Sequence, residues 1–161
     1  MSVPLLRTAT LDDLDAIMGL ESSTFSTDAW STDSMRAELA NPHARYLVAV
    51  RDEAIVGYAG LLAPRRSEQA DIQTITVAPD ARRGGLGRAL MNALITEARG
   101  RGAREIFLEV RADNPGAMSL YENLGFRVEG RKRDAYRDGD GYCDAIVMAL
   151  LEDEYRASQL D

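Results

Sequence analysis

Apolar residues follow two spacings along the chain, one typical of strands and one typical of helices. The first spacing predicts seven strands, over residues 3–9, 45–50, 54–63, 70–77, 104–110, 125–130 and 142–150. The second predicts four helices: one after Thr10, one from Ser31 or Thr32 to before Asn41, one with Leu86, Ala89, Leu90, Ala93, Leu94 and Ala98 on one face, and one over 114–126. The order β-α-α-β-β-β-α-β-α-β-β mixes hairpins with crossovers, so it predicts an α/β fold with a mixed sheet.

The strand over residues 70–77 changes its alternation part-way along. Ile72 is apolar at an even position, whereas Ile75 and Val77 are apolar at odd positions. A β-bulge near Thr74 explains this change, because one extra residue moves all later side chains to the other face. A strand buried on both faces is the alternative that the pattern leaves open.

The length of 161 residues fits one domain, expected over residues 1–151 with a polar tail over 152–161. No apolar run is long enough to span a bilayer, and the N-terminus lacks the pattern of a signal peptide. Cys143 is the one cysteine, which excludes an intrachain disulfide and favours a reducing cytoplasm. His43 is the one histidine and lies in a predicted loop, so no metal site and no Ser-His-Asp triad is expected.

The formal net charge is −7, which argues against general affinity for nucleic acid. Arginines are concentrated in residues 82–104 and 127–137. Acidic residues are concentrated near the N-terminus, at Asp12, Asp13, Asp15, Glu21, Asp28, Asp33 and Glu38. These charges are either solvated surface or, at the acidic end, a rim that attracts a cationic substrate.

The segment RRGGLG, residues Arg82 to Gly87, lies between a predicted strand and a predicted helix. Glycines let a ligand approach the backbone, and the free amides and dipole of a helix N-terminus favour a phosphate. The segment lacks the lysine of a nucleoside-triphosphate loop, and Leu90 replaces the third glycine of a dinucleotide fingerprint. A pyrophosphate site remains, with a solvated glycine turn as the alternative.

The spacing Arg82-x-x-Gly85-x-Gly87 matches the R/Q-x-x-G-x-G/A motif of the GCN5-related N-acetyltransferase (GNAT) superfamily. The later segment LEVRADNPGAMSLYENLGF resembles a second signature of the same superfamily. It is most similar to the RimI-like bacterial branch that acetylates the N-termini of ribosomal proteins. FSTDAWS and DAIVMAL also resemble this branch, and the resemblance covers roughly residues 3–150.

The resemblance implies a single GNAT domain with about seven strands, about four helices and a splayed central strand pair that binds acetyl-CoA. It places the pantetheine arm against the backbone of Ile75, Thr76 and Val77, with Asn114 and Tyr121 also touching the cofactor. It places the pyrophosphate at the corner formed by Arg82, Arg83, Gly84, Gly85, Leu86, Gly87 and Arg88.

Acyl transfer to an amine needs a neutral nucleophile and a proton donor for the departing thiolate. The resemblance implies that Glu109 is the general base and that Tyr121 is the acid. For Glu109 the alternative is a structural ion pair with Arg111 or Arg127, and for Tyr121 it is a purely core position. An α-amine has a pKa near ~8 and lysine one near ~10.4, so an N-terminus is the easier acceptor at neutral pH.

Three aromatic residues in predicted loops, Phe25, Trp30 and Tyr136, are candidate contacts for the acceptor. Two departures from the branch concern peptide specificity: Cys143 replaces a carboxylate, and Tyr136 is single where a pair is usual. The expected partner is a protein N-terminus, with neither nucleic acid nor membrane involved. A small amine or lysine acceptor, and a non-catalytic CoA-binding regulator, are the alternatives.

Overall fold

The computed structural model describes residues 3–24, 30–82 and 84–151. One mixed sheet with the strand order β1-β2-β3-β4-β5-β7-β6 runs through these residues. The strands are β1 (Leu5–Thr8), β2 (Ala44–Arg51), β3 (Ala54–Leu62), β4 (Gln69–Val77), β5 (Glu105–Arg111), β6 (Arg127–Asp138) and β7 (Gly141–Leu151). The helices are α1 (Leu14–Thr24), α2 (Thr32–Ala40), α3 (Leu86–Gly100) and α4 (Pro115–Asn123), with short 3₁₀ turns at Leu11–Asp13 and Pro79–Ala81. The predicted α/β architecture is confirmed, with seven strands and four α-helices in the described residues.

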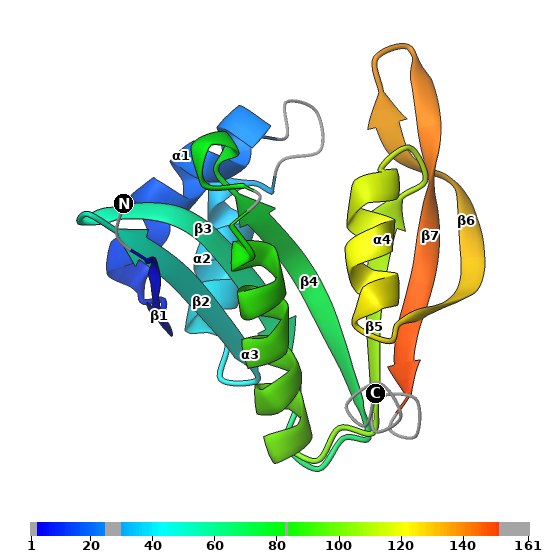
Figure 1. Cartoon of the computed structure of the whole chain (residues 1–161), viewed down its shortest axis with the longest axis horizontal. Helices are drawn as coiled ribbons and strands as arrows, with labels where there is room; N and C mark the ends of the chain where they lie inside the picture. Colours follow the sequence, from blue (N-terminus) through cyan, green and yellow to red (C-terminus); the bar gives the residue numbers. More distant parts are fainter. Residues whose placement is uncertain (1–2, 25–29, 83, 152–161) are drawn as a thin grey trace.

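Helices cover both faces of the sheet (Figure 1). Residues of α3 and α4, among them Leu90, Leu94 and Tyr121, form the larger core with one face. Ile17 of α1 and Met35 of α2 form a smaller core with the other face. The predicted apolar stripe of α3 needs one correction, because its buried side also includes Met91 and Ile95, whereas Ala89 is exposed.

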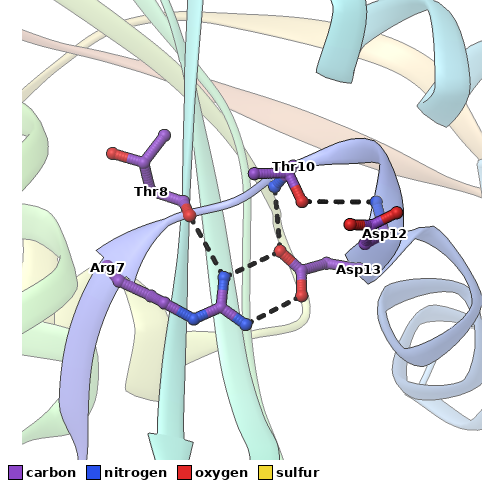
Figure 2. A network of polar contacts seen from close by, with 5 residues as sticks. All are labelled: Arg7, Thr8, Thr10, Asp12 and Asp13. Carbon is purple, nitrogen blue, oxygen red and sulfur yellow. Dashed lines mark hydrogen bonds and ion pairs between the residues drawn. The ribbon is translucent and has the colours of Figure 1, made fainter.

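The entry to α1 is fixed by a polar network (Figure 2). Thr10 caps the first turn, and Asp13 completes the capping box by accepting a 2.8 Å hydrogen bond from the backbone N–H of Thr10. Arg7 of β1 binds both carboxylate oxygens of Asp13, at 2.9 and 2.8 Å. Asp13, one of the acidic residues concentrated near the N-terminus, therefore has a structural partner in Arg7.

The predicted bulge in β4 is confirmed. Thr74 pairs with Gly60, but the next pair along joins Ile72 to Leu61, so Gln73 is the extra residue. As a result, Ile75 packs against the same core as Ile72.

The predicted splayed strand pair is also confirmed. Parallel β4 and β5 pair over three residues each, the last pair being Asp71 with Phe107. Beyond that point the two strands diverge (Figure 1). The far half of β4 therefore has an edge that β5 does not cover.

The β6–β7 hairpin is longer than predicted. β6 continues past an irregularity between Lys132 and Tyr136, and Tyr136 pairs with Cys143. The carboxylate of Asp144 supports the irregular segment, because it accepts hydrogen bonds from Arg131 and from the backbone N–H of Asp134. Tyr136 therefore lies on a strand, not in the loop that was predicted.

Candidate active site

The turn between β4 and α3 presents bare backbone at the start of a helix. Gly85 is the N-cap of α3 and has a φ of 80°, in the left-handed region that favours glycine. No side chain in the described part of the chain caps this helix, and the first amides of a helix have no partner within it. Together with the helix dipole, these amides suit the corner to an anion.

Two of the three arginines predicted at this corner can be placed. Arg82 is exposed, and its Nε donates a 3.0 Å hydrogen bond to the backbone oxygen of Val77. Arg88 is exposed in the first turn of α3. Arg83 lies outside the described residues. Positive charge therefore flanks the free amides.

The remaining corner residues leave the backbone accessible. Gly84 is exposed, whereas Leu86 is buried and anchors the helix to the core. A Cβ at Gly87 would lie 3.4 Å from Cδ2 of Leu120, so α4 borders the corner. A larger side chain at Gly87 would occupy the space between the two helices.

The uncovered edge of β4 leads away from the corner. The backbone N–H of Ala78 donates a hydrogen bond to the backbone oxygen of Val56 on β3. Along a strand, the backbone groups of successive residues point alternately to one side and the other. Those of Ile75 and Val77 therefore point toward the gap beside β5, whereas those of Thr76 point toward β3. Of the three residues predicted to pair with a pantetheine arm, two have their backbone groups directed into the gap.

A cleft of about 170 Å³ lies where β4 and β5 separate. Several predicted site residues line it, among them Trp30, Ile75, Glu109, Tyr121 and Tyr136. Asn114 also lines it, and its Oδ1 accepts a 3.1 Å hydrogen bond from the backbone N–H of Ala117, so Asn114 caps α4. A neighbouring hollow contains Asp71 and Lys132 and shares Glu109 with the cleft.

Glu109 is paired with Lys132, whose Nζ donates a hydrogen bond to its carboxylate. The expected partners in an ion pair were Arg111 or Arg127, so Lys132 was not predicted. Glu109 raises the pKa of Lys132. Burial, and then the Glu109 carboxylate, raise the pKa of Asp71, while Lys132 opposes the effect. A carboxylate with one cationic partner is therefore available on β5 inside the cleft.

The buried ring of Tyr121 belongs to the core and also lines the cleft. It packs against Phe126 with 6.2 Å between ring centroids. Burial, followed by the nearby Tyr136, raises the pKa of Tyr121 to about 12. The hydroxyl therefore keeps its proton at neutral pH.

Two of the three aromatic residues predicted to contact the acceptor can be placed. Trp30 and Tyr136 both line the cleft beside Glu109. The guanidinium of Arg111 lies 5.5 Å from the centroid of the Tyr136 ring, and Arg111 also pairs with Asp113 at 3.1 Å. Phe25 lies outside the described residues.

Gln73 and Glu21 are among the cleft residues that were not singled out from the sequence as site residues. Gln73 is the bulge residue, and its Oε1 accepts a 3.0 Å hydrogen bond from the hydroxyl of Tyr46. Glu21 of α1 accepts a 2.9 Å hydrogen bond from the backbone N–H of Trp30. The parity change in β4 was a signal for Gln73, whereas Glu21 was counted only among the acidic residues.

Comparison with known proteins places this arrangement in a family. The model of the Acetyltransferase (GNAT) family matches residues 14–126. The chain belongs to this acetyltransferase family. The match includes the α3 corner, and it also includes β4, β5 and α4, which each contribute residues to the cleft.

Individual relatives support the RimI-like branch. An Escherichia coli protein named [Ribosomal protein bS18]-alanine N-acetyltransferase is 48% identical over 83 residues, 52% of this chain and 56% of that protein. The Mycobacterium tuberculosis N-alpha-acetyltransferase RimI is 38% identical over 112 residues, 68% of this chain and 69% of that protein. The crystal structure of the Escherichia coli ribosomal-protein-S18-alanine N-acetyltransferase has a TM-score of 0.81 at 32% identity, covering 92% of this chain and 94% of that one. The predicted GNAT superfamily and RimI-like branch are confirmed.

Within residues 3–24, 30–82 and 84–151, no three His, Cys, Asp or Glu side chains are placed to hold a metal ion. None of the described helices is long and apolar enough to cross a bilayer.

Proposed function

We propose that this protein is an acetyl-CoA-dependent N-alpha-acetyltransferase. Its acceptor is the N-terminal amine of a small-subunit ribosomal protein. One observation carries the proposal: the bare N-terminus of α3 and the open edge of β4 lead to a cleft that contains both Glu109 and Tyr121. The name of the Escherichia coli relative supports the ribosomal acceptor, and that of the Mycobacterium tuberculosis relative supports acetylation of an α-amine. The catalytic domain spans residues 1–151, and the predicted polar tail, 152–161, lies outside the described residues.

The donor site fits acetyl-CoA without a metal. The amides at the start of α3 bind the pyrophosphate, and Arg83 and Arg88 add positive charge. The backbone of Ile75 and Val77 pairs with the amides of the pantetheine arm, much as an added strand would. Arg82 also binds the pyrophosphate, and to do so its side chain gives up the hydrogen bond to the backbone oxygen of Val77. Thr76 contributes shape but no backbone pairing, because its backbone groups face β3.

The reaction is a direct acyl transfer. The acceptor nitrogen attacks the thioester carbonyl carbon, a C–N bond forms and the C–S bond breaks. The proton lost by the amine passes to Glu109, and the hydroxyl of Tyr121 protonates the thiolate. Asn114 assists by capping α4, the helix that holds Tyr121 in the cleft.

The acceptor binds against Trp30 and Tyr136, which line the cleft beside Glu109. A protein N-terminus suits this chemistry because its pKa near ~8 leaves a usable neutral fraction at pH 7. A lysine or small-molecule amine is the second candidate, since the cleft residues named here would serve any amine.

Mass spectrometry of peptide libraries incubated with acetyl-CoA tests the proposal. Peptides with a free N-terminus should gain 42 Da, an acetyl group, at the α-amine, with ribosomal N-terminal sequences preferred. Matched peptides with a blocked N-terminus and an internal lysine are the control. Preferential acetylation of the blocked peptides would move the protein to the lysine alternative, and no transfer to any amine would favour a CoA-binding regulator.

A further inference from the structure

The cleft contains a second carboxylate that faces it from another element. Glu21 comes from α1, which packs against β3 and β4, whereas Glu109 stands on β5. Glu21 is only 1% exposed, yet it lines the same cleft. Its two oxygens differ: Oε2 accepts the hydrogen bond from Trp30, while Oε1 is buried with no partner in the described part of the chain.

A buried carboxylate oxygen without a partner is costly, because burial removes its hydration and nothing replaces it. Burial raises the pKa of Glu21, and the Trp30 hydrogen bond only partly opposes this. A donor that enters the cleft would satisfy Oε1 and recover part of that cost. The position of α1, on the face of the sheet opposite α3 and α4, places this oxygen away from the donor corner.

We propose that Glu21 binds the amine end of the acceptor, with Oε1 accepting a charge-assisted hydrogen bond from it. The proposal rests on the acetyl-transfer function proposed above and adds a residue that recognises its acceptor. Glu21 then orients the incoming amine from the α1 side, and Glu109 receives the proton from the β5 side. The bond from Trp30 fixes the carboxylate in position before the acceptor arrives.

The variant Glu21→Gln tests this directly, because it keeps the side-chain shape and an oxygen for Trp30 but removes the charge. The KM for a peptide with a free N-terminus should rise about tenfold or more, because one charge-assisted hydrogen bond is lost. The KM for acetyl-CoA should stay within about twofold. Glu38→Gln is the matched control: Oε2 of Glu38, on α2, is also buried without a described partner, but Glu38 does not line the cleft.

A second measurement separates amine binding from a structural role. Calorimetry on the CoA-bound protein compares a peptide with a free α-amine and the same peptide with a hydroxyl in its place. Wild type should prefer the amine, and Glu21→Gln should lose most of that preference, a change that altered packing would not produce. Equal affinities in wild type, or an unchanged preference in the variant, would overturn the proposal for Glu21. Absence of acetyl transfer by wild type would instead reject the proposed function, and this inference with it.

Discussion

The hydroxyl of Tyr46 on β2 donates a 3.0 Å hydrogen bond to the side-chain oxygen of Gln73, the extra residue of the β4 bulge. Tyr46 pairs across the strands with Gly60, and a Cβ at Gly60 would lie 2.3 Å from atoms of the Tyr46 ring. The absence of a side chain at Gly60 thus lets the ring lie there. The ring in turn fixes Gln73 close to where β4 leaves β5.

Substitution Gly60→Ala should displace the Tyr46 ring and loosen the bulge. We expect a loss of about 1–3 kcal/mol in the free energy of unfolding, typical of overpacking, together with a lower kcat. Urea unfolding and steady-state kinetics measure the two effects. Gly19→Ala on α1, where a Cβ would meet nothing within 4 Å, is the control and should stabilise by about 0.5–1 kcal/mol. Unchanged stability in Gly60→Ala would show that the ring can move aside freely.

Features encoded in adjacent residues were predictable, and features set by tertiary pairing were not. The parity change from Ile72 to Ile75 located the bulge, and the first helix was expected after Thr10, where the structure has it. The partner of Glu109 depends on the register of β6 across β7, which spacing does not reveal, so Lys132 was missed. Glu21 was missed for the same reason, because only the packing of α1 against the sheet brings it to the cleft.

The donor corner can be tested at Gly87. Substitution Gly87→Phe should fill the space beside Leu120 and obstruct the amides at the start of α3, so CoA affinity should fall about a hundredfold or more. Isothermal calorimetry with CoA measures this, and circular dichroism checks the fold. Gly100→Ala, at the other end of α3 with open space around its Cβ, should bind CoA like wild type. Retained affinity in Gly87→Phe would place the pyrophosphate elsewhere.

The Arg7–Asp13 pair should make stability depend on pH (Figure 2). The hydrogen bond from Arg7 lowers the pKa of Asp13 in the folded protein. A carboxyl whose folded pKa is depressed stabilises the fold above its ordinary pKa, near ~3.9, and loses this contribution as the pH falls through the folded value. Arg7→Ala should therefore cost about 1 kcal/mol near neutral pH, limited by solvent screening of the half-exposed arginine. In urea unfolding, a difference from wild type that did not shrink in acid would contradict this assignment.

Tyr121→Phe should separate the acid role from the core role. The ring can keep its packing against Phe126, so the free energy of unfolding should change by less than about 1 kcal/mol. The proton for the thiolate is lost, so kcat should fall by ~10²–10⁴-fold while CoA still binds. Tyr142→Phe, at a tyrosine that is 62% exposed, is the control and should leave kcat unchanged. A kcat within about twofold of wild type for Tyr121→Phe would leave Tyr121 a core residue only.

Glu109→Gln tests the proposed base and the choice of amine together. If Glu109 accepts the amine's proton, the substitution should lower kcat, and the loss should shrink as pH rises because the acceptor becomes neutral by itself. An N-terminal amine reaches that state near pH ~8 and a lysine only near ~10.4. A pH–rate series therefore compares a peptide with a free N-terminus and a blocked peptide that carries lysine.

Lys132→Met is the companion variant in that series, because it removes the cation paired with Glu109 and leaves the carboxylate in place. We expect the pH–rate profile of Lys132→Met to follow that of wild type, because the base remains, whereas the deficit in kcat of Glu109→Gln should shrink as the pH rises. A loss of kcat that is the same at every pH and equal in both variants would identify the Glu109–Lys132 contact as a structural ion pair. Faster transfer to the blocked lysine peptide by wild type would instead overturn the N-terminal acceptor while leaving Glu109 as the base.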